Sequence, residues 1–265
     1  MRDTSIRDTW SGMPQTTSEA GDQPFDASNP LIRKLCGFVT LSRAEKALLS
    51  QVSGRSRLVE ARTDIIREGE PPGGVFLILD GFACRYKIRA GGARHIAAYL
   101  LPGDICDLDV ALLDRMDHSI GTLAPCRVVQ IEPGQVEALL AHEGIARALR
   151  KSTLVDEATL REWLVNVGAR TALERIAHLF CELLLRLQVV GRATGDGFDL
   201  PLTQQDLADT TGLSNVHVNR TLQELRRQRL IELKSRSLRI LNLPGLKAAA
   251  EFKPNYLHLG DQAAA

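Results

Sequence analysis

Short β-rich runs separated by glycine turns fill residues 57–131 and constrain the fold more than any other feature. The runs read VFLIL, FACRYKI, RHIAAYL and CRVVQI, and the turns between them include Gly81, Gly91-Gly92 and Pro102-Gly103-Asp104. A parallel sheet would need a long crossover, usually a helix, between strands, and no helical run lies here. Many short strands at regular spacing favour an antiparallel barrel or roll. We predict a jelly-roll-like antiparallel β-roll over residues 29–141, with a short interrupted helical segment at its start.

A long helical pattern follows the roll, with one break expected near Gly144 and a second at Gly168. This helix, residues 142–168, holds more apolar side chains than water would tolerate: Leu149, Leu154, Val155, Leu160, Trp163, Leu164 and Val167. A seam with a second copy of the chain would cover them, so we predict a dimerisation helix. The alternative is that they pack on the chain's own roll.

The segment after this helix carries the strongest functional signal. A further amphipathic helix and the linker VVGRATGDGFD lead to Thr203, a predicted cap with Asp206 three residues later. Gly212 then supplies a turn and Ser214 a second cap, which together predict a helix-turn-helix. The stretch IELKSRSLRIL alternates like a hairpin and predicts a wing. The expected fold is therefore α+β, with a winged helix-turn-helix domain at 169–245, a disordered N-terminal tail at 1–28 and a C-terminal tail at 246–265.

The second helix of this motif predicts a DNA-reading face. At 3.6 residues per turn, Val218, Leu222 and Leu225 share a buried side, which leaves amides, an arginine and an imidazole exposed. Residues 214–240 hold seven Lys or Arg and two Glu, a local charge of +5 in a chain whose total is +1. Such an excess favours binding to the phosphates of double-stranded DNA. The predicted contact residues are Thr203, Ser214, Asn215, Val216, His217, Asn219, Arg220, Gln223, Arg226, Lys234 and Arg236.

Composition argues against other classes of protein. The five cysteines are at least twenty residues apart and the six histidines form no HExxH pair, so we expect no metal or iron–sulfur site, and no enzyme. No apolar run approaches the ~20 residues that span a bilayer, and the N-terminus lacks the apolar core of a signal peptide. We expect a cytoplasmic protein without a membrane partner.

A β-roll, a long helix and a winged helix-turn-helix, in that order, resemble the Crp/Fnr family of bacterial transcription regulators over about residues 30–245. "IIREGEPPGGVFLILDGFACRY" and "YLLPGDICDL" are similar to the family's cyclic-nucleotide-binding-like roll. "RIAHLF" and "LTQQDLADTTGLSNVHVNRTLQEL" match its reading domain. The resemblance implies a homodimer on a palindromic operator, contact with RNA polymerase, and a small-molecule effector sensed in the roll.

The segment DLDVALLDRMDHSI departs from the family's nucleotide-binding pattern. Asp107 and Leu108 stand where cyclic-nucleotide binders carry Gly-Glu, and His118-Ser119 where they carry Arg-Ser. Leucine cannot hold a ribose hydroxyl and histidine replaces a bidentate arginine poorly, so cyclic AMP is doubtful and no cofactor is named. The predicted effector pocket comprises Ile96, Tyr99, Asp107, Leu108, His118, Ser119, Leu160 and Arg161.

Two other functions stay open. The chain could be a constitutive DNA-binding regulator whose roll is only a dimer scaffold. It could also be a cyclic-nucleotide-binding regulatory subunit, although no catalytic or membrane module accompanies the roll.

Overall fold

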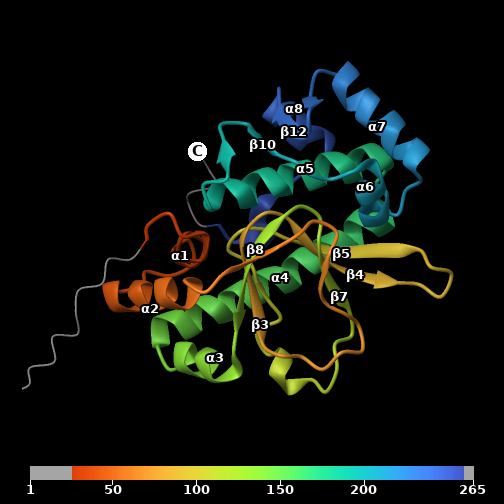
Figure 1. Ribbon diagram of the computed structural model, residues 1–265. Helices are drawn as coiled ribbons and strands as arrows, with labels where there is room; N and C mark the ends of the chain where they lie inside the picture. Colours follow the sequence, from red (N-terminus) through yellow and green to blue (C-terminus); the bar gives the residue numbers. More distant parts are fainter. Residues whose placement is uncertain (1–25, 260–265) are drawn as a thin grey trace, which may run out of the picture.

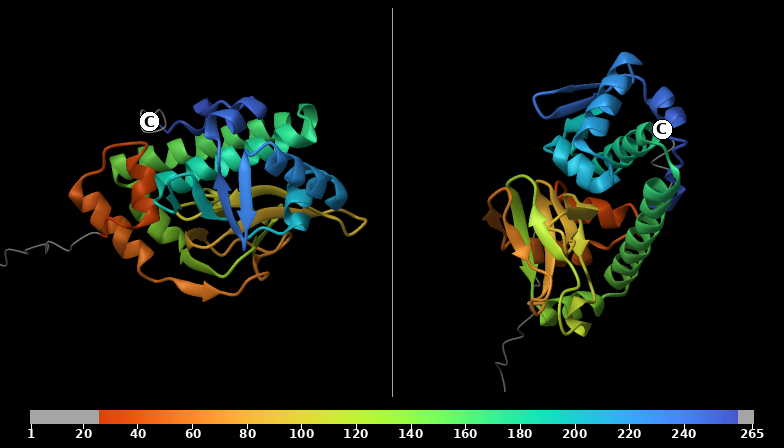
Figure 2. Two further views of the ribbon diagram at one scale, coloured as in Figure 1. Left: turned by 90° about the horizontal axis from the view of Figure 1, so that it is seen from above. Right: turned by 90° about the vertical axis from the view of Figure 1, so that its right-hand side faces the viewer.

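A computed structural model of the chain describes residues 26–259. It has two lobes, a β-roll and a helical reading domain, joined by one long helix that runs along the side of both (Figures 1 and 2). The predicted α+β fold is confirmed. The N-terminal tail predicted at 1–28 lies almost entirely outside the described residues.

Two antiparallel four-stranded sheets form the roll. One has the order β1-β8-β3-β6, made of Arg57–Val59, Cys126–Ile131, Val75–Asp80 and Ile105–Cys106. The other has the order β2-β7-β4-β5, made of Asp64–Ile66, Ser119–Thr122, Ala83–Ile88 and Arg94–Leu100. All four runs singled out in the sequence are strands. The longest pairing joins β4 to β5 in a hairpin that projects sideways from the roll, beneath the reading domain (Figure 1).

Short helices flank the roll. Helix α1 (Pro30–Cys36) ends before Gly37, and α2 (Arg43–Ser53) begins at Ser42, whose hydroxyl forms a capping box with Glu45. Helix α3 (Pro133–Leu140) follows the last strand, and a 3₁₀ turn, η1 (Val110–Leu112), lies between β6 and β7. These helices bury Leu31, Leu35 and Leu49 against the roll.

The long helix is α4, Glu143–Ala169. It starts after a break at Ala141 and His142, two residues before the expected position, and ends one residue after Gly168. Its first turns pack on the roll through Ile145 and Leu149. Its later turns pack in the reading domain through Trp163, so one rigid element belongs to both lobes.

The reading domain consists of α5 (Ala172–Val189), α6 (Gln204–Thr211), α7 (Asn215–Arg227) and a small sheet. That sheet has the order β11-β12-β10-β9, made of Ile231–Lys234, Ser237–Ile240, Gly197–Asp199 and Ala193–Thr194. The stretch expected to be a plain linker therefore folds into the β9–β10 hairpin and extends the wing. Alternation is hard to see in strands of two and three residues.

The C-terminal tail predicted from residue 246 is wrong for its described part. Helix α8 (Leu243–Ala249) and the 3₁₀ turn η2 (Pro254–Leu257) fold back on α5 and α4. Leu246, Tyr256 and Leu257 are buried there. The short polar-flanked segment contains only a few apolar residues, and their burial depends on a surface that the rest of the chain builds.

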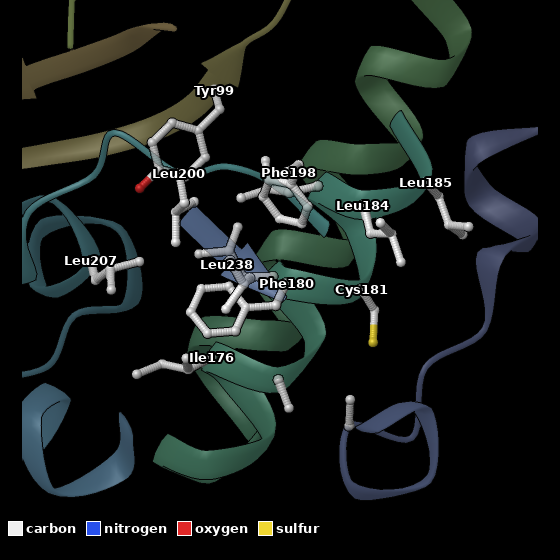
Figure 3. Close-up of a cluster of buried hydrophobic side chains, with 14 of the residues drawn as sticks. Tyr99, Ile176, Phe180, Cys181, Leu184, Leu185, Phe198, Leu200, Leu207 and Leu238 are labelled. Carbon is white, nitrogen blue, oxygen red and sulfur yellow. The ribbon is translucent and has the colours of Figure 1, made fainter. Parts of the chain in front are cut away.

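A single apolar core runs through the reading domain and into the roll. Phe180 of α5 lies at its centre with Phe198, Leu207 and Leu238 around it, and Tyr99 of the roll strand β5 approaches from the other lobe (Figure 3). Because both lobes contribute to this cluster, the position of α6 depends on the roll.

Candidate DNA-reading face and roll cavity

The exposed face of α7 has the composition predicted for base reading. Ser214 caps the helix by accepting a hydrogen bond from the His217 backbone N–H at 3.3 Å. Val218, Leu222 and Leu225 are buried as expected, whereas Val216 is 62% exposed and Arg220 and Gln223 face solvent. The short connection from α6 depends on Gly212, whose φ of 68° lies in the left-handed region that other residues avoid.

Amide side chains connect α6 to α7 on this face. Asn215 Nδ2 donates to Gln205 Oε1 at 2.6 Å, and Asn219 Nδ2 donates to Gln204 Oε1 at 3.4 Å. Thr203 sits just before these glutamines and caps α6 through the backbone N–H of Asp206. The two asparagines of the reading helix are thus held in place by the helix beside it.

Four basic side chains surround this face and are exposed to solvent. Arg220, Arg226, Lys234 and Arg236 are exposed, and none has an ion-pair partner within residues 26–259. Arg236 stands at the wing tip, where it and Ser235 adopt positive φ of 63° and 50°. Two successive residues with positive φ make the tight turn that matches the twist of a hairpin.

Two arginines of the roll bind the first turn of α6. Arg62 donates two hydrogen bonds of 2.7 Å to the fully buried Asp206 carboxylate, and Arg94 donates another at 2.6 Å. Arg94 also donates to Asp209 at 2.8 Å. Burial alone would raise the pKa of Asp206, but hydrogen bonds from Arg62 and Thr203 hold it well below its usual range. The carboxylate is therefore ionised and joins the two lobes at neutral pH.

A cavity of about 410 Å³ lies between the roll and α4. The polar groups on its roll side form one chain of contacts. Arg85 Nη2 lies 3.2 Å from Asp107 Oδ1, and His118 Nε2 lies 3.1 Å from Asp107 Oδ2. The other ring nitrogen of His118 lies 2.7 Å from Asp117. Burial opposes protonation of His118, but contacts with Asp107 and Asp117 outweigh it, so the pKa of His118 is raised.

A second ion-pair cluster borders the cavity through Asp104 and Arg186. Asp104 accepts hydrogen bonds from Lys34 at 2.8 Å and from Arg186 at 2.7 Å. Arg186 also donates to Glu182 and to the Tyr99 carbonyl, at 3.1 and 3.0 Å. Burial raises the pKa of Asp104, yet the two cations more than offset it and lower the pKa to about 2. Both charges of the Asp104–Arg186 pair are already used within the protein.

One wall of the cavity contacts the reading domain directly. Tyr99 lines the cavity, and its hydroxyl shares a 2.5 Å hydrogen bond with Thr210 on α6. Its ring meets Trp163 edge-on with 5.7 Å between centroids, and Trp163 Nε1 donates to Glu182 on α5. A change of shape in the cavity would therefore reach α5 and α6 through direct contacts.

Two family models match the chain: a cyclic nucleotide-binding domain over residues 56–143 and a Crp-like helix-turn-helix domain over residues 174–249. The nitrogen fixation regulation protein FixK of Azorhizobium caulinodans is 26% identical over 206 residues, which are 77% of this chain and 82% of that protein. The transcriptional activator protein FnrA of Stutzerimonas stutzeri is 22% identical over 219 residues, 82% of this chain and 88% of that protein.

A solved structure shares the fold. FixK2 from Bradyrhizobium japonicum superposes with a TM-score of 0.66 at 24% identity, covering 74% of this chain and 96% of that one. The chain belongs to the Crp/Fnr family of transcription regulators.

The structure of this Crp/Fnr regulator brings together five of the eight residues predicted for an effector pocket. Tyr99, Asp107, Leu108, His118 and Leu160 line the cavity. The remaining three do not line it.

Each of these three has a different place in the fold. Ile96 is fully buried in the apolar core. Ser119 is turned toward Glu68, whose backbone N–H donates to its hydroxyl at 2.9 Å. Arg161 is 67% exposed on the outer side of α4 and pairs loosely with Glu157 at 3.8 Å. Residues 152, 156 and 160 of α4 line the cavity. Arg161 follows Leu160 and therefore lies about 100° further round the helix.

Sequence reasoning missed several polar residues of both sites. Arg85, Ser152, Asp156 and Arg186 line the cavity. Arg85 lies in a stretch quoted for its family resemblance but was not among the predicted pocket residues, and the other three belong to no quoted motif. The signal was present for two of them, because Ser152 and Asp156 are polar residues at i, i+4 spacing on the same face of the helix as Trp163. On α6, the adjacent amides Gln204 and Gln205 directly follow the predicted cap Thr203. Their position could have indicated the contacts with Asn215 and Asn219.

Within the described range 26–259, no group of three His, Cys, Asp or Glu side chains could hold a metal ion. No helix in that same part of the chain is long and apolar enough to cross a membrane.

Proposed function

We propose that this Crp/Fnr regulator is a cytoplasmic homodimer that binds a two-fold symmetric operator through α7 and is gated by a signal detected in the roll. The observation that carries this proposal is the exposed face of α7, on which Val216, Arg220 and Gln223 stand with no competing ion pair in the described residues. Arginine reads guanine through O6 and N7, and valine can touch a thymine methyl.

An uncovered apolar stripe on α4 supports the dimer. Leu154, Leu160, Leu164 and Val165 are 59%, 52%, 69% and 49% exposed. Four large apolar side chains on one helix form a patch that a second α4 would cover. Two α7 helices related by a two-fold axis would then meet half-sites one helical turn of DNA apart, about 34 Å. Contact with RNA polymerase is expected from the family resemblance.

Gating is supported by the contacts between the roll and α6. Arg62 and Arg94 hold Asp206, and Tyr99 bonds Thr210 while also lining the cavity. A signal that moves the cavity wall would therefore change the placement of the reading domain. An effector must bind one arrangement better than the other, because equal affinity shifts nothing.

Sedimentation and operator selection test the proposal together. Wild type should sediment as a dimer and select a palindrome from random DNA. Leu160→Glu with Leu164→Glu should give monomers, because like charges would be buried in the seam. The matched control changes Leu112 and Leu113, two exposed leucines of the roll, to Glu and should stay dimeric. A dimer of unchanged stability in the α4 variant, or a wild type that selects no sequence, contradicts the proposal.

The departure of the segment DLDVALLDRMDHSI from the family's nucleotide-binding pattern favours one second candidate, a regulator that binds DNA constitutively. Asp107 is occupied by Arg85 and His118, so the segment could serve only to stabilise the roll. Operator affinity of Arg85→Ala separates the two candidates, since a scaffold role predicts lower stability but the same affinity per folded dimer.

A further inference from the structure

The cavity between the roll and α4 is lined on its helix side by two polar side chains that make no hydrogen bond or ion pair with another residue of the range 26–259. These are Ser152 and Asp156, one helical turn apart on α4. From the roll side Arg85 lines the same cavity, but its guanidinium is bound to Asp107 and its Nε–H is sealed inside the protein. Polar groups inside a protein are usually paired, so two free acceptors on α4 mark a place for a ligand that donates hydrogen bonds.

The charges of the lining distinguish between ligand classes. Five carboxylates line the cavity (Asp104, Asp107, Asp117, Asp156 and Glu157), against three Lys or Arg (Arg85, Lys87 and Arg186). Each of the three cations is already bound to a carboxylate: Arg85 to Asp107, Arg186 to Asp104 and Lys87 to Glu68. Asp156 has no ion-pair partner within 4 Å in the range 26–259, although Arg85 and Arg186 lie close enough to attract it. The lining therefore holds more negative than positive side chains, and its cations are already bound at ion-pair distance.

This balance does not fit a cyclic nucleotide. A cyclic phosphate would have to displace a carboxylate from Arg85 or Arg186 and would then face Asp156. Leu108, at the position where cyclic-nucleotide binders of the family carry glutamate, cannot accept a hydrogen bond from a ribose hydroxyl. The family's nucleotide is therefore a poor ligand for these residues.

We infer that the cavity binds a small organic amine, with its cationic nitrogen on Asp156 and Ser152. A carboxylate that accepts from an ammonium makes a charge-assisted hydrogen bond, roughly twice as strong as a neutral one. The Ser152 hydroxyl, one helical turn before Asp156, adds a second acceptor on the same face. The ligand class is argued from the cavity alone. An effect of the bound amine on DNA binding rests on the proposed gating function.

The apolar side chains of the lining indicate the shape and polarity of the rest of the ligand. Apolar surface comes from Leu108, Leu149, Leu160 and Trp163, which favours a compact hydrophobic or aromatic body over an extended polyamine. A volume of about 410 Å³ lies at the lower end of the range for small-molecule sites. Because Tyr99 is part of the same wall, a bound amine would lie against the residue that bonds Thr210 of α6.

Calorimetry with matched pairs of probes tests the charge preference on the full chain. The pairs are tyramine with 4-hydroxyphenylacetate and histamine with imidazole-4-acetate, with cyclic AMP as the family ligand. The amine of at least one pair should bind about tenfold or more tightly than its acid, as expected for one charge-assisted hydrogen bond. An acid or cyclic AMP that binds as tightly as the amines overturns the inference, and so does a wild type that binds neither amine.

Two acids of α4 supply the test variant and its control. Asp156→Asn should weaken amine binding about tenfold. Glu143→Gln loses the same charge at an exposed position in the first turn of α4, outside the cavity, and should stay within about twofold. If Asp156→Asn unfolds early, Ser152→Ala, with an expected loss of about threefold, takes its place. Equal amine affinity in all of these variants contradicts the site.

Operator binding, measured by fluorescence anisotropy without any amine, keeps the two hypotheses apart. A protein that binds amines but no operator retains the amine site and loses the proposed DNA-reading function. A protein that binds its operator but no amine retains the reading function and loses the amine site.

Discussion

Two sets of arginines in this protein have the same chemistry and opposite surroundings. Arg220 and Arg236, on α7 and the wing, are exposed and have no carboxylate partner in residues 26–259. Arg62, Arg94 and Arg186 each donate to one or two carboxylates between the lobes. The first set can exchange water for phosphate or guanine, whereas the second is committed to holding the roll, α6 and α5 together.

An arginine therefore predicts DNA contact only where no carboxylate of the protein pairs with it. A hydrated, unpaired guanidinium costs little to move onto a phosphate. A buried pair is different, because removing one partner leaves an uncompensated charge. Changes in the two sets should therefore affect different measurements.

The largest effect is expected from Asp206→Asn. Two arginines would lose their shared carboxylate inside the protein, and the free energy of unfolding should fall by about 3–5 kcal/mol, nearer the lower figure because Arg62 is 43% exposed. Urea denaturation measures this. Asp199→Asn, the same change at an exposed position of β10, is the control and should shift the midpoint little. Equal midpoints for both variants would show that the lobes are not held by this carboxylate.

The next effect concerns His178, buried between Phe252 and Tyr256. Burial, helped by repulsion from Arg170, lowers its pKa to about 4. Between about pH 6.5 and 4 the unfolded chain binds a proton that the native His178 does not, so stability is full above pH 6.5 and falls as the pH drops. The loss is about 3 kcal/mol at most.

His178→Phe keeps the ring and removes the titration. Chemical denaturation from pH 7 to 4 should then show a flatter slope in the variant than in wild type. Identical slopes would mean that another group titrates there.

An exposed arginine should behave in the opposite way. Arg220→Ala should leave the unfolding free energy almost unchanged and remove about 1–3 kcal/mol of discrimination at one base pair in each half-site. Arg226→Ala, a phosphate contact by prediction, should weaken all sequences alike and lower the salt dependence. Competition binding with single-base operator variants distinguishes them, and uniform weakening by Arg220→Ala would remove it from the base-reading residues.

The smallest effect belongs to the amides beneath the reading face. Gln205 holds Asn215 through one exposed hydrogen bond, so Gln205→Ala should reduce operator affinity by about 0.5–1.5 kcal/mol. Gln228 follows the last residue of α7 and donates a hydrogen bond to Glu224. Gln228→Ala, which loses that bond, is the control. Anisotropy titration that shows equal losses for both would mean that Gln205 does not position Asn215.

Much of the fold could be predicted from local pattern. The caps Ser42, Thr203 and Ser214, the turn at Gly212 and the buried face of Val218 depend on residues within a few positions of one another. The reading face was accessible for the same reason, because a helix fixes which side chains share a side over a few turns.

Only the tertiary structure decided the cavity and the contacts between the lobes. Arg85 and Asp156 are 71 positions apart in the sequence, and Arg62 meets Asp206 across 144. The same long-range packing turned a predicted tail into η2 against α4 and placed Arg161 outside the pocket. Hydrogen bonds and ion pairs act over a few ångströms in space and carry no periodicity along the chain, so a sequence names the groups but the packed fold decides which of them meet.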